Sequence, residues 1–476
     1  MKICLFILLN VNILAQPIII DKKIIDLNQP LAYVHKIKKI NTTEFGAVGE
    51  TINETGHRNI FFAKFNYDSL IFSKSYHSET SLVAQDFKMS DDSSFIIVGD
   101  NAILKISNIG DSIWLKNINT VPNASTLYSI VQVEDTNLVA CGYIPVFQPP
   151  YLTYYSIWVI KFNLNGEIIW QKFYGGATYY LADLGTQLIR SSDEHFFITG
   201  SDGSIFLLKI DFEGNQLFFN HYNNLSLRGG TISYDLKEGL DSSYYITGSI
   251  PIWNNAEDIL LIKTDNKGDT LFVKNYNGNP SDWNPNTSSG DEYGVFIKII
   301  NRNNVILGGN GLQTFTNDPL KIILRLDSFG NVIWKQVIES QNFSRLSSIE
   351  ISNENKLIYL GVEDVQPNKI FIVTTSYDVT DIKEKKSAPT ANILYQNYPN
   401  PFNPITKIKY SILRNSYVTI KIYDLLGNEI ETLVNEEKSE GIYSVVFSAR
   451  NLSSGIYFYR MQAGNFSDTK KFIILK

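Results

Sequence analysis

Apolar and aromatic runs alternate with short polar turns along most of the chain, and one such unit recurs with small changes. In the copy at 205–222, an apolar run ends at Lys209, a tight turn follows at 211–214, and a second aromatic-rich run closes the unit. This pattern predicts a β-hairpin. Related copies occupy 60–78, 102–120, 157–176, 259–278 and 322–340.

The turn of each hairpin has a local chemical reason. Its first residue is Asp or Asn in most copies, and such a side chain accepts hydrogen bonds from the backbone that follows. A glycine three residues later, such as Gly214, supplies the positive φ that closes a type I turn with a bulge. The copy at 60–78 has Asp68 but no turn glycine. A calcium-loop interpretation is weaker, because these turns lack the dense alternating oxygen ligands of such loops.

A second marker precedes each hairpin: three apolar or small residues, one variable residue and a glycine. Its glycines are spaced by roughly 43 to 61 residues. A further candidate strand lies upstream of each marker, for example at 127–133 and 346–351, so each unit offers four strands. Tryptophans at a fixed register in the last strand are expected to pack between units. The marker glycines are Gly49, Gly99, Gly142, Gly200, Gly248, Gly309 and Gly361, and the tryptophans are Trp114, Trp170 and Trp334.

Repetition of a four-stranded unit predicts an all-β fold, a seven-bladed β-propeller at 16–377. The pattern resembles bacterial propeller repeats with a Lys-φ-Asp-x-x-Gly-Asn-x-φ-Trp core, and an array of β-sandwiches is the structural alternative. The seventh unit has three candidate strands and no fourth, whereas 17–27 is strand-like and belongs to no unit. An unpaired blade edge invites aggregation. We therefore expect Ile18 to Ile25 to pair with 369–377 as the outer strand of the last blade.

The irregular segments of the repeat all belong to one face of the predicted disc. In an antiparallel blade with strands a to d, the a–b and c–d turns share one face, and the b–c loops and blade links share the other. The long segments are 143–156, 249–258 and 310–319 among the loops and 174–183, 220–230 and 275–292 among the links. Loops on a rigid scaffold commonly carry binding residues. Their aromatic side chains would suit a sugar ring or a peptide, and the bland alternative is that they cap the blades. The candidate ligand residues are Tyr151, Tyr154, Tyr155, Tyr179, Tyr180, Arg228, Trp253, Trp283 and Phe315.

Residues 1–15 predict a signal peptide. Lys2 gives a positive start, 3–14 is mostly apolar, and Ala15 precedes a plausible cleavage site. The run is too short to span a bilayer, and no later run approaches about 18 apolar residues. We therefore expect an exported, soluble chain without a transmembrane segment. Cys141 would remain as a buried, inert thiol.

Composition narrows the function classes. Aromatic residues make up 13% and charged residues 19% of the chain, a balance typical of buried sheet. The net charge of −6 comes without a basic stripe, which argues against nucleic acid. The histidines show no paired metal spacing and no catalytic or phosphate-binding motif occurs, so neither a cofactor nor a metal is expected. Carboxylates distant in sequence could still pair in space for hydrolysis of a glycosidic bond.

The end of the chain differs from the repeat. A charged and then small, polar stretch at 378–392 predicts a linker. Short alternating segments between Gly, Asn and Ser turns then predict a small antiparallel, Ig-like β-sandwich at 393–476.

Five motifs mark this last segment: a proline-rich opening at 398–406, a run at 418–426 with Tyr423, Asp424 and the following Gly427, Gly-Ile-Tyr at 441–443, a Gly-Ile-Tyr-Phe run within 452–458, and a terminal Lys-Lys run. In this order they resemble the C-terminal sorting domain of the type IX secretion system. The residues that carry the resemblance include Pro399, Asn400, Pro401, Phe402, Asn403, Pro404, Gly455, Tyr457, Lys470 and Lys471.

The resemblance implies passage through the periplasm and across the outer membrane of a Gram-negative cell, with the type IX machinery as partner. Such a domain is commonly removed as the cargo is released or anchored at the surface. We therefore expect a secreted or cell-surface, non-catalytic β-propeller that binds an extracellular glycan or protein. The alternative is an extracellular hydrolase or lyase that degrades polysaccharide or peptide on the same scaffold.

Overall fold

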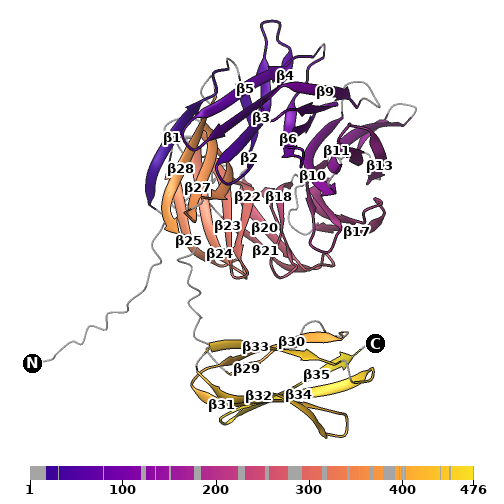
Figure 1. The fold of residues 1–476 in the computed structure, drawn as a ribbon, viewed down its shortest axis with the longest axis vertical. Helices are drawn as coiled ribbons and strands as arrows, with labels where there is room; N and C mark the ends of the chain where they lie inside the picture. Colours follow the sequence, from indigo (N-terminus) through magenta and orange to yellow (C-terminus); the bar gives the residue numbers. More distant parts are fainter. Residues whose placement is uncertain are drawn as a thin grey trace, which may run out of the picture. The chain divides into compact units, whose positions relative to one another are not determined.

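The structure is a computed structural model of the 476-residue chain. It describes residues 18–29, 32–78, 80–118, 125–134, 136–148, 152–175, 184–222, 231–251, 257–276, 292–312, 319–339, 344–352, 354–363, 368–378, 392–395, 397, 400, 402, 404–439, 441–449 and 452–474. The chain divides into two compact units, Met1–Val379 and Thr380–Lys476. Every named element in the described residues is a β-strand (Figure 1). The expected signal peptide at 1–15 lies outside the described residues, as does nearly all of the expected linker.

The described residues of the first unit form seven four-stranded antiparallel sheets. The first comprises β2 (Ala32–Lys39), β3 (Glu44–Ile52), β4 (Arg58–Asn66) and β5 (Leu70–Tyr76). The second comprises β6 (Ala84–Met89), β7 (Phe95–Gly99), β8 (Ala102–Ile106) and β9 (Ser112–Asn117). The third comprises β10 (Thr126–Glu134), β11 (Asn137–Gln148), β12 (Leu152–Asn163) and β13 (Ile168–Tyr174).

The remaining four sheets repeat this order. The fourth comprises β14 (Leu184–Arg190), β15 (Phe196–Ser201), β16 (Ile205–Ile210) and β17 (Gln216–Tyr222). The fifth comprises β18 (Ile232–Glu238), β19 (Tyr244–Pro251), β20 (Glu257–Thr264) and β21 (Thr270–Tyr276). The sixth comprises β22 (Glu292–Asn301), β23 (Asn304–Leu312), β24 (Pro319–Asp327) and β25 (Val332–Glu339). The seventh comprises β26 (Ser344–Ile351), β27 (Lys356–Glu363), β28 (Lys369–Asp378) and β1 (Ile19–Asp26).

The first strand of each sheet, which we call the inner strand, packs against the inner strands of both neighbouring sheets. These contacts run from β2 through β6, β10, β14, β18 and β22 to β26, and β26 contacts β2 again. The sheets therefore form a closed ring of blades, which is a β-propeller (Figure 1). The hydrophobic core lies between successive sheets: one buried cluster, for example, joins Cys141 and Val159 of the third sheet to Phe196 and Phe206 of the fourth.

The expected closure of the ring is confirmed. Strand β1 pairs antiparallel with β28, from Ile19 opposite Thr375 to Asp26 opposite Lys369. Beyond the ladder, the Ile18 N–H donates to Ser376 Oγ at 3.0 Å. The segment that belonged to no repeat therefore completes the last blade and removes its unpaired edge.

For six of the seven marker glycines, all but Gly309, the described residues show a structural reason that the sequence pattern did not reveal. In all seven sheets, the inner strand has a register shift in its pairing with the second strand. At this shift the inner backbone approaches the glycine closely. A Cβ on Gly99 would lie 1.8 Å from the Val83 carbonyl oxygen, and a Cβ on Gly142 would lie 1.8 Å from that of Thr126. Only glycine leaves space for this approach.

The bulged turns are also confirmed. The turn glycine Gly214 has a φ of 78°, its N–H donates to the Asp211 carbonyl at 3.1 Å, and the Asp211 carboxylate accepts the Asn215 N–H at 2.7 Å. This glycine contacts the blade before it, because a Cβ on Gly214 would lie 3.2 Å from the Trp170 ring. The repeat tryptophans do pack between blades, as expected.

Among the described residues, a tyrosine adds a hydrogen bond to this contact at four boundaries. It lies at the end of the outer strand, and its hydroxyl donates to the carbonyl of the turn glycine in the next blade. We call this the tyrosine–glycine lock. The four pairs are Tyr76 with Gly110 at 2.8 Å, Tyr174 with Gly214 at 2.6 Å, Tyr222 with Gly268 at 3.0 Å, and Tyr276 with Gly330 at 2.8 Å.

The second unit is a small β-sandwich, as expected. One sheet orders β29 (Ile393–Leu394), β30 (Ile405–Ile412) and β33 (Gly441–Ser448). The other orders β32 (Glu429–Lys438), β31 (Ser416–Tyr423), β34 (Gly455–Ala463) and β35 (Phe466–Ile474). Apolar side chains of both sheets form one core, which includes Ile408 and Phe447 from the first and Ile420, Tyr459 and Phe472 from the second.

Candidate functional site

Most of the ligand residues expected from the sequence lie outside the described residues. These are Tyr151, Tyr179, Tyr180, Arg228, Trp253, Trp283 and Phe315. Tyr154 lies in β12, but its side chain is also outside the description. Tyr155 is described and is partly buried.

The prediction of a loop at 143–156 is wrong, because most of this segment belongs to strands β11 and β12. Strands β11 and β12 remain paired as far as Gln148 opposite Leu152. The apolar side chains of Ile144 and Val146 pack on the core between the second and third blades, which favours the extended ladder over an irregular loop. The loops expected at 249–258 and 310–319 are shortened in the same way, with pairs at Pro251–Glu257 and Leu312–Pro319.

The structure brings other residues together at the centre of this face. A cavity of about 430 Å³ lies where the N-terminal halves of all seven inner strands converge, and we call it the loop-side mouth. It lies on the face to which the blade links and the b–c hairpins belong. Its hydrogen-bonding and aromatic lining includes His35, Lys36, Gln85, Tyr128, Tyr234 and Arg345. Its volume lies in the range of small-molecule sites.

A row of tyrosines leads out of the loop-side mouth along the third blade. The rings of Tyr128 and Tyr143 are 5.8 Å apart, and those of Tyr143 and Tyr155 are 5.3 Å apart in an edge-to-face arrangement. Thr126 Oγ1 lies 3.4 Å from Tyr143 Oη and 3.0 Å from Asp100 Oδ1. Burial raises the pKa of Tyr128, so its phenol stays protonated and can donate a hydrogen bond. The candidate residue Tyr155 is thus linked to the mouth through Tyr143.

Two carboxylates, Glu50 and Asp100, lie outside the lining of the mouth and close to its polar residues. Glu50 Oε1 lies 3.9 Å from His35 Nε2, and Glu50 Oε2 lies 3.4 Å from Arg58 Nε. Asp100 forms side-chain hydrogen bonds with Thr126 and Gln85. Burial raises the pKa of both carboxyl groups.

The imidazole of His35 is neutral at pH 7. Burial lowers its pKa to about 4, and the positive charges of Arg345 and Arg58 add to this effect. A neutral imidazole has one nitrogen that donates and one that accepts a hydrogen bond. The mouth therefore offers a fixed neutral donor and acceptor next to aromatic rings.

Below the mouth, charged side chains of different blades meet across the channel. Lys36 Nζ donates to Gln187 Oε1 at 3.1 Å and lies 3.5 Å from Asp86 Oδ2. Lys38 Nζ lies 2.5 Å from Asp86 Oδ1. Burial alone would raise the pKa of Asp86, but Lys36 and Lys38 outweigh it and lower that pKa. These contacts link the inner strands β2, β6 and β14 across the channel below the mouth.

Asp86 also helps to close the ring. Its Oδ2 accepts the Ile130 N–H of the next inner strand at 3.2 Å. Asp235 has the same position in the fifth blade, and its Oδ2 accepts the Ile297 N–H at 2.9 Å. The two buried aspartates therefore have a structural role at the bulges.

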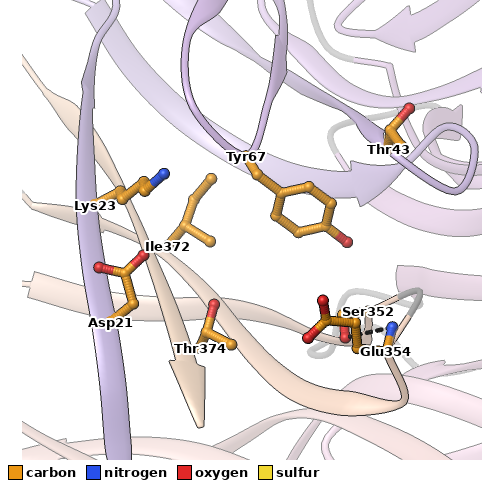
Figure 2. Close-up of a pocket in the computed structure, with 8 residues that line it drawn as sticks. All are labelled: Asp21, Lys23, Thr43, Tyr67, Ser352, Glu354, Ile372 and Thr374. Carbon is orange, nitrogen blue, oxygen red and sulfur yellow. Dashed lines mark hydrogen bonds between the residues drawn. The ribbon is translucent and has the colours of Figure 1, made fainter.

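A second cavity, of about 280 Å³, lies on the opposite face between the last and first blades. Figure 2 shows the Tyr67 ring near its centre, with Asp21 and Lys23 of β1 on one side and Glu354 on the other. The turn that carries Tyr67 has no glycine, and this boundary uses an ion pair between Lys23 and Asp68 in place of the lock. We attribute this cavity to ring closure.

In the second unit, two described motif residues, Asn400 and Phe402, form hydrogen bonds with the end of strand β35. Asn400 Oδ1 accepts the Ile473 N–H at 2.8 Å, and the Phe402 N–H donates to the Ile473 carbonyl at 3.1 Å. Phe402 is buried, and its ring lies 5.5 Å from that of Phe472. Tyr457 stacks on Phe472 at 5.7 Å.

The other motif residues are placed as follows. Gly455 begins β34, Lys470 and Lys471 lie in β35, and the Pro404 carbonyl accepts the Ala449 N–H at 2.8 Å. Pro399, Pro401 and Asn403 lie outside the described residues.

Residues 396–475 match the family model described as "Secretion system C-terminal sorting domain". The second unit is a type IX sorting domain. A search of curated proteins finds no match to the chain. The described part of the chain contains no helix long and apolar enough to cross a membrane. It also contains no group of three or more His, Cys, Asp or Glu side chains arranged to hold a metal ion.

Several solved structures are similar to the chain. One is PorZ, described as an essential bacterial surface component of the type IX secretion system of Porphyromonas gingivalis, with 13% identity, a TM-score of 0.45, and coverage of 92% of this chain and 58% of that one. Another is the β-propeller domain of the Trilobed protease from Pyrococcus furiosus, with 10% identity, a TM-score of 0.41, and coverage of 72% and 93%. A protein of unknown function from Dyadobacter fermentans has 10% identity, a TM-score of 0.39, and coverage of 75% and 99%. The propeller assignment itself rests on the closed ring of inner strands.

Proposed function

We propose that this protein is an extracellular binding protein that uses the loop-side mouth of its propeller to bind a glycan. The observation that carries this proposal is the convergence of all seven inner strands on a cavity of about 430 Å³ that combines tyrosine rings with hydrogen-bonding side chains. Aromatic faces pack on the apolar face of a sugar ring, and imidazole, amide and guanidinium groups bind its hydroxyls. Asp100 forms a hydrogen bond with the Gln85 side chain, and Arg345 Nη2 donates to the Val34 carbonyl at 2.7 Å, so these two groups are positioned before a ligand arrives, which reduces the entropy cost of binding.

The sorting domain directs export by the type IX secretion system. We propose that residues 1–15 direct the chain to the periplasm first, and that the sorting domain is separated from the propeller at the linker 378–392 when the cargo is released or anchored at the cell surface. The propeller would then act outside the cell or on its outer surface. Mass spectrometry of the extracellular protein, which gives both termini, tests this processing.

The ligand proposal is tested with the full secreted chain on glycan and protein arrays. Tyr128→Ala should weaken binding to the recognised glycan about tenfold, a loss typical of a central aromatic contact. Tyr67→Ala is the matched control, because it removes the same side chain from the cavity on the opposite face. Equal losses in the two variants, or binding to proteins alone, would contradict the proposal.

One observation favours the alternative of a hydrolase or lyase. Glu50 and Asp100 lie in neighbouring blades behind the mouth, burial raises the pKa of both, and Asp100 contributes to the raised pKa of Glu50. Raised carboxyl pKa values are typical of general acids. In an enzyme, Glu50→Gln and Asp100→Asn would each abolish the release of reducing ends from the bound polysaccharide. If the protein only binds, the unmodified chain should release no reducing ends from the polysaccharide.

A further inference from the structure

The hairpin turn between β31 and β32 of the sorting domain has the same hydrogen bonds as the propeller turns. The Gly427 N–H donates to the Asp424 carbonyl at 3.1 Å, and Gly427 has a φ of 85°. Asp424 Oδ1 accepts the N–H groups of Leu426 at 2.9 Å and Asn428 at 2.8 Å, while Asn428 Nδ2 donates to Asp424 Oδ2 at 2.9 Å. The tip is therefore rigid, although it lies at the end of a hairpin.

The surroundings of the two kinds of turn differ. In the propeller, Phe212 follows the turn aspartate and packs edge-to-face on Phe196 at 5.2 Å, and Leu164 packs on the core between blades. Gly166 and Gly214 are buried against the neighbouring blade. In the sorting domain, a Cβ on Gly427 would have no heavy atom within 4 Å among the described residues. The same turn is thus packed against a neighbour in one unit and uncovered in the other.

Two leucines occupy the uncovered tip. Leu425 is 67% exposed and Leu426 is 87% exposed, the largest value among the exposed large hydrophobic residues of the described chain. The polar groups beside them are already paired: Lys421 Nζ lies 2.7 Å from Glu429, which also accepts the Thr432 hydroxyl at 2.7 Å. The exposed side chains of Leu425 and Leu426 therefore lie next to polar side chains that already have partners. Single exposed apolar residues are common on protein surfaces, but an adjacent pair fixed on a rigid turn is suited to insertion into an apolar pocket.

We propose that Leu425 and Leu426 form the contact through which the export machinery recognises this sorting domain, by insertion into an apolar pocket of a protein component of that machinery. The argument for this partner is the role of the unit itself: a sorting domain must be bound by the apparatus that exports it. The rigid turn means that little conformational entropy is lost on docking. The proposal does not depend on the ligand of the propeller.

The test is an export assay in a cell with a working type IX secretion system. The variant Leu425→Gln/Leu426→Gln should reduce the extracellular amount of the full chain at least roughly tenfold, as truncation of central contact residues does. The protein should accumulate in the periplasm. The Tm of the purified chain should stay unchanged, because both side chains are exposed. Of two single variants, Leu426→Met, which keeps an apolar side chain, should be exported normally, and Leu426→Gln should be exported less.

The propeller supplies a matched control. Ile109 and Phe329 have the same turn position as Leu426 and are 63% and 71% exposed. Ile109→Gln/Phe329→Gln should leave export unchanged. Normal export of the sorting-domain variant, or an equal loss in this control, would overturn the proposal. So would a purified variant whose oligomeric mass or hydrogen-exchange protection in the propeller changes, since the leucines would then contact a second copy or the propeller.

Discussion

Two kinds of boundary between neighbouring blades contrast in this propeller. At four boundaries, the tyrosine–glycine lock ties an outer strand to the turn of the next blade, and each lock is built from residues of adjacent repeats. At the boundary between the last and first blades, which we call the seam, β1 completes the last sheet with residues from the start of the chain. Arg345 Nη2 donates to the Val34 carbonyl at 2.7 Å across the seam, between residues 311 positions apart. The locks are repeated and local, whereas the seam is single and depends on distant segments.

The contrast between locks and seam predicts that loss of β1 lowers the stability of the propeller more than any other change considered below. Deletion of 18–27 removes the buried side chains of Ile25 and Leu27 and leaves β28 as an exposed edge. We expect a loss of at least roughly 5 kcal/mol in the free energy of unfolding of the propeller, since each buried aliphatic side chain contributes about 1.5–3 kcal/mol before the ladder is counted. Urea denaturation followed by tryptophan fluorescence measures it.

Two point variants separate packing at the seam from the mere presence of the strand. Ile25→Ser should shift the urea midpoint strongly, because Ile25 is 4% exposed, and Ile24→Ser should not, because Ile24 is 50% exposed. If the variant that lacks 18–27 had the same urea midpoint as the unmodified chain, the ring would not need strand β1.

The second prediction concerns a regular boundary. Gly214→Val places a β-branched residue at a φ of 78° and brings a Cβ to 2.9 Å from Lys172 and 3.2 Å from Trp170. We expect a cost of about 3 kcal/mol, from the left-handed backbone and the crowding together. Gly427→Val is the matched control, because it has the same turn and no neighbour among the described residues. It should cost only about 1–2 kcal/mol in the sorting domain. Equal costs would show that the contact with Trp170 contributes nothing.

The difference between locks and seam also separates what the sequence could predict from what it could not. The turn at Asp211 to Gly214 is specified by four neighbouring residues, so its geometry follows from local chemistry. The pairing of β1 followed from counting strands, because an unpaired edge in the last blade needed a partner. Both predictions depend on rules that act within one repeat or on the total number of strands.

The loop-side mouth could not be found in this way. His35 and Arg345 meet because the ring closes, and no spacing along the chain encodes their distance. The loop expected at 143–156 was wrong for a related reason: the strands extend where Ile144 and Val146 find a neighbouring blade to pack on. One signal was available, because the polar residues Lys36, Asp86, Gln187 and Asp235 share one position, just after the bulge of their inner strands. Alignment of the repeats at their bulges would have indicated a polar channel.

The third prediction tests the seam by pH. The folded pKa of His35 is about 4, below its usual 6.5. Between these values the unfolded chain binds a proton that the folded chain does not, so the stability of the propeller should fall as the pH drops from 6.5 to 4. Because 32% of the side chain is exposed, we expect about 1–2 kcal/mol rather than the full shift. Urea midpoints at pH 7 and pH 4.5 measure the change.

The matched variants for this prediction are His35→Gln and His57→Gln. The first should remove the contribution of His35 and make the seam less sensitive to acid. The second removes an exposed histidine outside the inner strands. A pH dependence that is the same in His35→Gln and the unmodified chain, or one that is lost in His57→Gln, would contradict the assignment to the seam.

The smallest predicted effect isolates one hydrogen bond of the lock. Tyr174→Phe keeps the ring that packs between the third and fourth blades and removes only the hydroxyl that donates to the Gly214 carbonyl at 2.6 Å. The loss leaves a carbonyl without this donor, so we expect a cost of about 1 kcal/mol, seen as a small shift in the urea midpoint. Tyr67→Phe is the control at the seam, where the hydroxyl's one hydrogen-bond contact among the described residues is a long one, 3.5 Å to the Thr42 carbonyl, and should contribute almost nothing. If the two variants unfold at the same urea concentration, the locks owe their effect to ring packing alone, and the distinction between locked boundaries and the seam lies in β1 and not in the tyrosine hydroxyls.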